Sequence, residues 1–495
     1  MSKIKFFKPL IISSLLYLFL LIFITLKIYD NFDGHTQISV INYKILMIGV
    51  ISLTMLPIIF YTYSEEEKNY YPIFYLIIIY FFLTYCSYYI LDYDYEIKND
   101  IPKYSYNKSS VAVYYSLKIL FLGLAALNLG YFLCRAIIKK KIKCPNILKI
   151  SDYKEILFIF SIINFGTLFF FYFIEIHLLI PKIAQIKYPL VYFSTSLTFL
   201  LLFNSFSVYR VFALIPVLIF FCIELTSGSN VFPFMILFFG YSLFVCYSKK
   251  YFITPIIVIL ILGLITNSFK EDYRKIIWNP LIQDKSNNLE YKLTVFILSF
   301  KNYYFNIEND GMNFFKEKVL KKNMRRINHS ATSLVFVANE TPEEIPYFNG
   351  ESYRILATKI IPRFLWKDKP IDDLGNVFGK RYKVLSETDK VTSWNMPTLN
   401  EFYSNFGTKG VIVGMFIIGF VIRLLMNFFS LKEKNNYLLS IGFTLLYPFL
   451  FLENHLSLVI GASVQSFIFL IIMTVICKQF ILQIRKIFSN EKKNN

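Results

Sequence analysis

Cysteine is scarce in this chain, and its positions exclude a disulfide scaffold from the largest polar region. Only six cysteines occur among 495 residues, and each falls in or beside an apolar run. None lies in the long polar stretch 270–410. A disulfide framework and a thiolate metal site are therefore excluded from that stretch.

Acidic residues are also few, which leaves the chain strongly basic. The 33 acidic residues face 52 lysines and arginines, for a formal net charge of +19. Such a charge invites a nucleic-acid partner, but most of the cations stand at the ends of apolar runs. No basic patch accompanies a soluble fold, so we expect no nucleic acid among the partners.

Apolar runs of membrane-spanning length recur from end to end. The chain is 56% hydrophobic, and a helix needs about 20 apolar residues to cross a bilayer. The first run lacks a small-residue cleavage site and is therefore interpreted as a retained span. The sequence predicts an all-α polytopic membrane protein with about twelve spans, near residues 9–29, 44–63, 72–91, 111–138, 155–176, 189–208, 211–226, 231–248, 251–269, 411–430, 437–453 and 456–480.

Lysine and arginine near the span ends set the expected orientation. Positive charge gathers on one side when both termini are placed in the cytoplasm. The acidic "SEEEKNY" (64–70) then falls inside, which the rule tolerates because acidic residues count little in it. We expect a bundle of about nine spans in 1–269, one large extracytoplasmic loop in 270–410, and about three spans with a basic cytoplasmic tail in 411–495. The short pair 211–226 and 231–248 forms either two spans or a re-entrant hairpin.

Nucleotide-binding machinery is missing. The sequence has no GxxxxGK[ST], no GxGxxG after a strand, and no predicted cytoplasmic segment large enough for a nucleotide domain. An enzyme of this kind needs a substrate that is already activated, and bacterial membranes offer polyprenyl-diphosphate-linked sugars. No cofactor is expected. The pair Asp372–Asp373 gives no full ligand set, so no metal is expected either.

Cations that suit a diphosphate leaving group stand in the large outer loop. Arginine offers a fork of donors that matches phosphate oxygens. The candidates are Arg274, Arg325, Arg326, Arg354, Arg363 and Lys369. The alternative interpretation is that these cations contact anionic membrane lipids.

Aromatic and acid–base candidates are interleaved with those cations. Sugars stack on aromatic rings, which favours Trp366, Trp394 and Tyr403 as sugar contacts; an interfacial aromatic belt is the alternative. A general base has to accept the proton of the acceptor hydroxyl. The residues do not decide among the candidates His329, Tyr353 and Glu401. A lone histidine near a span end, such as His455, is expected to be structural.

The outer loop carries an ordered series of short motifs. It includes "TPEEIPYFNGESY" (341–353), "IPRFLWKDKP" (361–370) and "TSWNMPTLNEFYSNFGTKG" (392–410). Together with the span order, this series resembles the Wzy-type O-antigen or capsular oligosaccharide repeat-unit polymerases. The motif part covers about 100 residues, and elsewhere the likeness is one of topology. One departure is "TSGSN" (226–230), where similar proteins often have "TGSR".

The resemblance implies a metal-independent glycosyltransferase that uses undecaprenyl-diphosphate-linked oligosaccharides in the bacterial inner membrane. It further implies a chain-length regulator and a flippase as partners. The arginines named above would bind the diphosphate, with Tyr353, Trp366 and Lys369 shaping the site. Glu401, Tyr403 and Gly407 would fix the return into span ten.

Two other functions fit parts of the same pattern. An O-antigen ligase shares the outer loop and its arginines and differs in its acceptor. A lipid-linked oligosaccharide flippase is a transporter, and it should place its cations inside the bundle rather than in a long outer loop. The sequence favours the polymerase over both.

Overall fold

The computed structural model describes residues 37–64, 67, 70, 72–92, 110–138, 154–173, 184–204, 214–226, 228, 237, 254–279, 289–314, 321–359, 361, 366, 368–390, 392–429 and 435–494. Three predictions lie outside these residues: the first span at 9–29, all but residue 237 of the segment 231–248, and Arg363.

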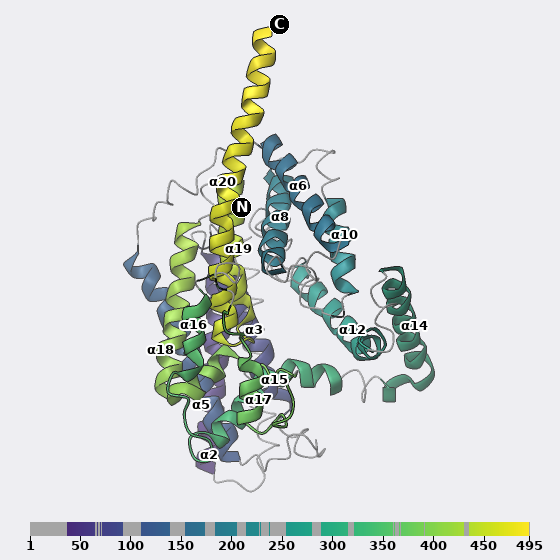
Figure 1. The fold of residues 1–495 in the computed structure, drawn as a ribbon. Helices are drawn as coiled ribbons and strands as arrows, with labels where there is room; N and C mark the ends of the chain where they lie inside the picture. The colour runs from purple at the N-terminus through teal and green to yellow at the C-terminus, as the bar shows by residue number, and fades with distance from the viewer. Residues whose placement is uncertain are drawn as a thin grey trace, which may run out of the picture. The chain divides into compact units, whose positions relative to one another are not determined.

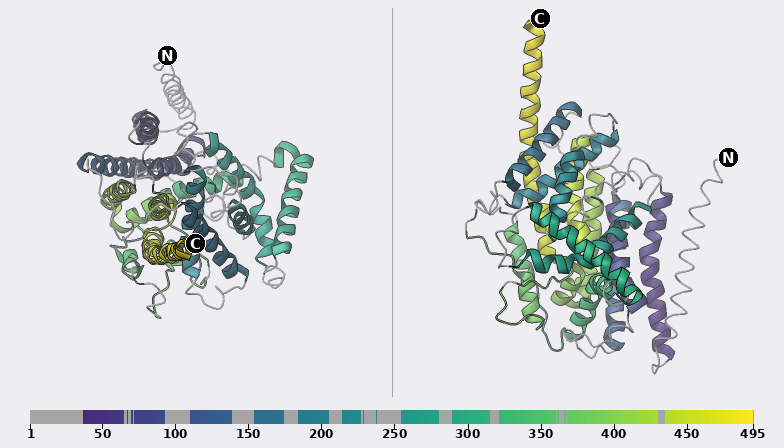
Figure 2. Two further views of the ribbon diagram at one scale, coloured as in Figure 1. Left: turned by 90° about the horizontal axis from the view of Figure 1, so that it is seen from above. Right: turned by 90° about the vertical axis from the view of Figure 1, so that its right-hand side faces the viewer.

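Every regular element among the described residues is helical, and Figures 1 and 2 show no strand in the coloured part of the chain. The α-helices are α2 (Gln37–Tyr63), α3 (Ile73–Phe81), α5 (Ser110–Ile137), α6 (Lys154–Phe173), α8 (Ala184–Asn204), α10 (Leu214–Leu225), α12 (Thr254–Ile277), α14 (Leu289–Phe314), α15 (Lys321–Glu340), α16 (Arg354–Lys359), α17 (Leu374–Arg381), α18 (Thr398–Phe428), α19 (Asn436–Leu446) and α20 (Leu456–Asn494). The π-helical turns η2 (Phe82–Cys86) and η3 (Tyr88–Asp92) follow α3, and the 3-10 turns η7 (Glu351–Tyr353) and η9 (Tyr447–Phe451) precede α16 and α20.

Five stretches of helix are long and apolar enough to cross a membrane. They cover 42–61, 73–90, 112–137, 398–428 and 456–484. Shorter apolar helical stretches cover 156–167, 189–201, 215–225 and 436–451. All nine overlap predicted spans, because runs of mostly large apolar residues with few charges favour both helix and burial in lipid. The prediction of an all-α chain with helices of membrane-spanning length is confirmed.

The chain forms two compact units. Unit 1 comprises 1–142, 327–428 and 446–464, and unit 2 comprises 143–326, 429–445 and 465–495. The predicted outer loop 270–410 is therefore divided at residue 326. Its expected boundaries also fall inside helices, because α12 continues to Ile277 and α18 already begins at Thr398.

Helices α5 and α18 form the central pair of unit 1 and run parallel. The hydroxyls of Tyr115 and Thr408 are 3.5 Å apart near the start of both helices. More than four turns of α5 further on, Nη1 of Arg423 donates to the Tyr131 hydroxyl at 3.0 Å. The two pairs have nearly the same separation in sequence, which is the signature of parallel packing in constant register.

Small residues allow this pair to touch backbone to backbone. A Cβ added at Gly130 would come within 2.1 Å of the Phe416 carbonyl oxygen, and one at Gly419 within 2.1 Å of the Leu127 carbonyl oxygen. No side chain fits such a space, so the two glycines set the close approach of α5 and α18. Figure 1 shows the two helices side by side.

Other helices of unit 1 run either parallel or antiparallel to this pair. Helix α2 is parallel to α5, since Asn128 donates to the Leu53 carbonyl at 3.1 Å and Gly49 packs on the Phe121 ring. Helix α3 runs the opposite way, since Tyr75 near its start shares Glu67 with Tyr131 late in α5. Beyond its end, the Tyr89 hydroxyl lies 2.8 Å from the Ser116 hydroxyl early in α5. At the start of α18, the Thr398 N–H donates to the carbonyl of Leu452, just before α20, at 2.9 Å. Helices α2, α5, α18 and α20 therefore start at one common end of unit 1.

Candidate active site

The motif segments meet at the first turns of α18. The N–H of Phe348 donates to the Ser404 carbonyl at 3.0 Å, and that of Asn349 to the Asn405 carbonyl at 3.2 Å. The Tyr403 hydroxyl donates to the Thr341 carbonyl at 3.1 Å. Segments about 60 residues apart in the sequence are thus joined by hydrogen bonds to backbone groups at the common starting end of the helices.

A kink in α18 makes room for this junction. Gly407 has φ +60° and ψ −151°, and Phe406 before it is also non-helical. Only glycine adopts this backbone conformation readily. A Cβ at Gly407 would in addition lie 2.7 Å from the Tyr347 hydroxyl oxygen. The prediction that Gly407 fixes the entry into the membrane helix agrees with this geometry.

Glu401 is the central acceptor of the junction. Its carboxylate is fully buried and accepts a hydrogen bond of 2.8 Å from the Ser352 hydroxyl. Its second oxygen accepts one of 2.6 Å from the N–H of Leu456, the first residue of α20. A carboxylate at a helix N-terminus satisfies an otherwise unpaired N–H and interacts favourably with the helix dipole. Glu401 therefore links η7, α18 and α20 as a positioning residue.

Asn405 completes the same network. Its amide nitrogen donates to the Ser352 hydroxyl at 2.9 Å, and its oxygen accepts from the N–H of Gly350 at 3.0 Å. Both Asn405 and Ser352 are buried. Hydrogen bonds therefore connect every element of the junction to a neighbour, and the resulting network holds the motif segments in place.

Asp372 anchors the segment that follows the "IPRFLWKDKP" motif. Its carboxylate accepts hydrogen bonds from the Lys359 ammonium at 2.6 Å and the Ser457 hydroxyl at 2.6 Å. The other oxygen lies 3.3 Å from Nε2 of His455, whose Nδ1 lies 2.9 Å from the Asn395 side-chain oxygen. Burial by itself raises the pKa of the Asp372 carboxyl. The hydrogen bonds outweigh it, and this pKa lies well below its usual range.

Tyr353 lies beside this network, and its hydroxyl takes no part in it. The hydroxyl is buried and has no hydrogen-bond partner among the described residues. Its ring lies against Phe402 and Phe406, with centroids 6.4 and 6.1 Å away. Burial, and then the charge of nearby Glu401, raise the pKa of the Tyr353 phenol. The phenol therefore stays protonated and can donate a hydrogen bond to a substrate oxygen.

A comparison with known proteins places the whole of this architecture in one family. A family model described as "Domain of unknown function (DUF8712)" matches residues 45–486. The chain belongs to this family. No curated protein and no solved structure matches it. The DUF8712 match begins within α2 and ends within α20, so it includes both the junction at Glu401 and the opposite ends of the helices.

The predicted cations of this DUF8712 chain fall in different settings. Arg354 is exposed at the start of α16, directly after Tyr353. Lys369 is buried and donates to the Ile361 carbonyl at 2.8 Å. Arg274, Arg325 and Arg326 belong to unit 2, and the last two are exposed.

Arg274 has a local structural task as well. Its Nε donates to the Gly228 carbonyl at 2.7 Å, and its guanidinium lies 4.3 Å from the centroid of the Trp278 ring. Gly228 is the middle of the "TSGSN" turn, where the resembling proteins often carry an arginine. In this chain an arginine from α12 supports that turn instead.

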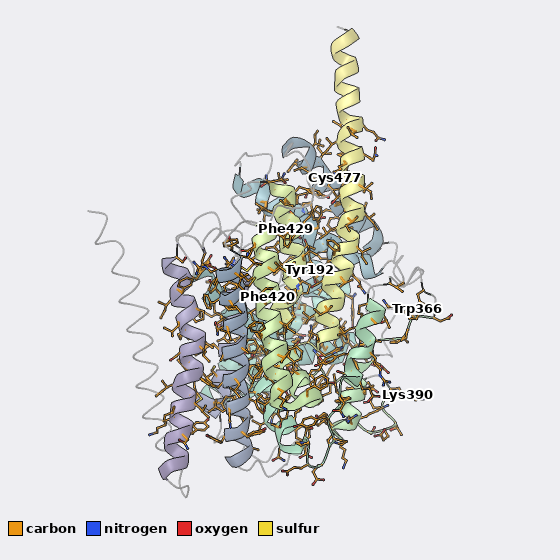
Figure 3. The ribbon with its side chains drawn as sticks, turned by 90° about the vertical axis from the view of Figure 1, so that its left-hand side faces the viewer. Tyr192, Trp366, Lys390, Phe420, Phe429 and Cys477 are labelled. Carbon is orange, nitrogen blue, oxygen red and sulfur yellow. The ribbon has the colours of Figure 1, made fainter. Side chains whose placement is uncertain are left out.

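The predicted aromatic contacts and His329 also differ in accessibility. Trp366 is half-buried, and in Figure 3 it lies on the connection beside the short helices of the motif region, as does the exposed Lys390. Trp394 is buried between Phe336 and Tyr382, with centroids 6.2 and 5.8 Å away. Tyr403 is buried, and His329 is half-buried in α15. Trp366 is the sugar-contact candidate that presents a surface.

Sequence reasoning missed most of the residues that hold the junction. Ser352 and Asn405 stand inside the quoted motifs "NGESY" and "SNFG", so their place in the motif series was the available signal. Lys359 stands in none of these motifs, and the sequence predicts a structural role for His455 without indicating its partner. Nothing local in the sequence pairs these two with Asp372, because that contact requires the chain to return at the start of α20.

Proposed function

We propose that this chain is a membrane glycosyltransferase that polymerises lipid-linked oligosaccharide repeat units of an O-antigen or a capsular or exopolysaccharide. The growing glycan passes from undecaprenyl diphosphate to the next lipid-linked unit on the outer side of the bacterial inner membrane. The observation that carries the proposal is the junction at Glu401. The motifs that resemble the polymerases are joined there by hydrogen bonds into one body at the end of the membrane-length helices.

The chemistry assigned to this body is a displacement at the sugar carbon attached to the diphosphate. The bond from that carbon to the diphosphate oxygen breaks, and a bond to an acceptor hydroxyl oxygen forms. The acceptor proton goes to a base, and undecaprenyl diphosphate leaves. Arg354 and Arg363 stabilise the developing charge on the diphosphate, Tyr353 donates a hydrogen bond to a substrate oxygen, and Trp366 stacks on a sugar.

The proposed topology has about twelve spans with both termini in the cytoplasm. It is supported by the directions of the helices in unit 1. Helices α2, α5, α18 and α20 correspond to the predicted spans two, four, ten and twelve, which cross the membrane in the same sense. Their common starting end carries the motif region, as the proposal requires. A flippase and a chain-length regulator are the partners that such a polymerase needs.

The test is the glycan profile of a strain that lacks the gene, with variants reintroduced from a plasmid. We expect the deletion to leave single repeat units on the surface glycan. Arg354→Ala and Arg363→Ala should give the same profile while the protein stays inserted at normal levels. Lys390→Ala, which removes another exposed cation of the motif region, should give a normal ladder.

The other outcomes separate the alternatives. Normal ladders from both arginine variants would overturn the assignment of the diphosphate contacts. Polymer that remains unattached to its surface anchor after deletion would indicate a ligase. Loss of all exported glycan would indicate a flippase.

A further inference from the structure

A second polar network lies at the last turns of α18, far from the junction at Glu401. Its centre is Glu67, which follows α2 and is fully buried. The carboxylate accepts hydrogen bonds from Nη1 of Arg423 at 3.0 and 2.9 Å. The hydroxyls of Tyr75 and Tyr131 donate to it at 2.9 and 2.8 Å. The network thus joins α3, α5 and α18 of unit 1.

A second arginine lies at the partly exposed edge of this network. Nε of Arg135, at the end of α5, lies 3.1 Å from the Glu67 carboxylate, and the Arg135 side chain is 24% exposed. Two guanidinium groups therefore contact the same carboxylate. The Tyr70 ring lies 4.3 Å from the Arg423 guanidinium.

Two hydrogen-bond donors in and beside the network also lack an acceptor. Nε of Arg423 is buried and has no hydrogen-bond partner among the described residues. The same holds for the side-chain nitrogen of Asn427, which stands one turn further along the same face of α18. Arg423 is 2% exposed and Asn427 3%. Buried donors without partners are destabilising, so a fold that keeps two of them side by side is incomplete without an acceptor.

The unfilled N–H donors belong to a guanidinium group and an amide, and the Arg135 guanidinium contacts the same carboxylate as Arg423. Guanidinium groups repel a cation. A ligand with several acceptor oxygens fills such donors, and phosphate oxygens fit guanidinium groups best. We infer that Arg423 and Asn427, with Arg135 at the accessible side, bind a phosphate group at the end of unit 1 opposite the Glu401 junction. The phosphate belongs either to a membrane-lipid head group or to a free phosphate ion.

The experiment measures thermal unfolding of the purified full-length chain in a neutral detergent. Inorganic phosphate is titrated against chloride at equal ionic strength. In a second arm, phosphatidylglycerol is compared with diacylglycerol, which has the same acyl chains and lacks the phosphate. We expect the melting temperature to rise with phosphate, with phosphatidylglycerol, or with both. The arm that responds identifies the source of the phosphate.

The diagnostic variant is Asn427→Leu, which removes one unfilled donor and keeps the Glu67–Arg423 pair. Without ligand it should melt at or above the wild-type temperature, because a buried orphan donor has been lost. Its half-maximal stabilisation should need about tenfold more phosphate, the loss expected for one charge-assisted hydrogen bond. Asn164→Leu is the matched control, since Asn164 of α6 also has a buried amide nitrogen without a partner among the described residues but belongs to unit 2.

Two results would overturn the site. One is the absence of any stabilisation by phosphate or phosphatidylglycerol beyond their controls. The other is an Asn427→Leu variant that keeps the full wild-type response. The readout is stability, so it stands independently of whether the chain polymerises glycan.

Discussion

Helix α18 takes part in a buried hydrogen-bond network around a glutamate at each end. The two networks differ in whether all their donors have acceptors. In its first turn, Glu401 accepts hydrogen bonds from Ser352 and from the backbone of Leu456. In its last turns, Nη1 of Arg423 donates to Glu67, while Nε of Arg423 has no partner among the described residues. The first network closes on itself within the chain, whereas the second is short of an acceptor.

We infer from this difference that the Glu401 network has a structural role and that the Arg423 network also binds a ligand. A buried network whose donors and acceptors are matched fixes the elements that contribute to it. At the Glu401 end, matched donors and acceptors hold the motif segments together, and the buried Tyr353 hydroxyl beside them has no partner among the described residues. At the Arg423 end, the mismatch lies in the network itself, so the ligand we propose there completes the fold as well as occupying a site.

The largest effect should come from breaking the Arg423 end. In Arg423→Ala, the fully buried Glu67 carboxylate loses its main partner. Removing one member of a buried ion pair costs about 3–5 kcal/mol, because the remaining charge is uncompensated. We expect little folded protein after extraction into detergent, as measured by size-exclusion chromatography and by thermal unfolding.

A double variant sharpens this result. Glu67→Gln combined with Arg423→Met removes both charges and should recover most of the folded fraction. If Arg423→Ala alone melts like the wild type, Glu67 has another sufficient counter-charge and the comparison between the two ends fails.

A smaller effect is expected at the Glu401 end. Glu401→Ala leaves the Ser352 hydroxyl and the Leu456 N–H without their acceptor in a buried site. The cost should be about 2–3 kcal/mol, since each lost partner leaves a neutral group rather than a charge. Glu401→Gln keeps one acceptor oxygen and should cost less. Thermal unfolding of the two variants beside Arg423→Ala gives the order, and an equal loss for Glu401→Ala and Glu401→Gln would argue against the role of the α20 N-terminus.

The sequence predicted the helices well and these networks poorly, for a physical reason. Apolar runs determine helix position locally, so nine helical stretches overlap the predicted spans. Glu67 was interpreted as part of an acidic cytoplasmic loop, the weak point of the predicted orientation. Its burial depends on Arg423, which is 356 residues away. The sequence alone does not show whether a charged residue is solvated or paired with a residue far away in the chain.

The motif region shows the same limit. Its candidate residues Glu401, Tyr353 and Tyr403 come from two of the ordered motifs, whose backbones are hydrogen-bonded to each other. Their division of labour was not visible. Glu401 stood among the candidate bases, and only the start of α20 reveals that its carboxylate caps a helix.

The smallest expected effect is a pH dependence at Asp372, which tests whether the Glu401 end is held by charge. The pKa of this carboxyl is lowered in the folded chain, so its contribution to stability is present above the ordinary pKa of about 3.9. That contribution is lost as the pH falls below this value toward the folded pKa. Between pH 5 and pH 3, the wild type should lose about 1–2 kcal/mol more than Asp372→Asn, which lacks the titrating group. Melting curves of the two proteins at matched ionic strength measure the difference.

Asp373→Asn is the control, since the neighbouring Asp373 is exposed and its replacement should leave the acid sensitivity of the wild type intact. Parallel curves for Asp372→Asn and the wild type would mean that Lys359 and His455 do not stabilise the ionised carboxylate.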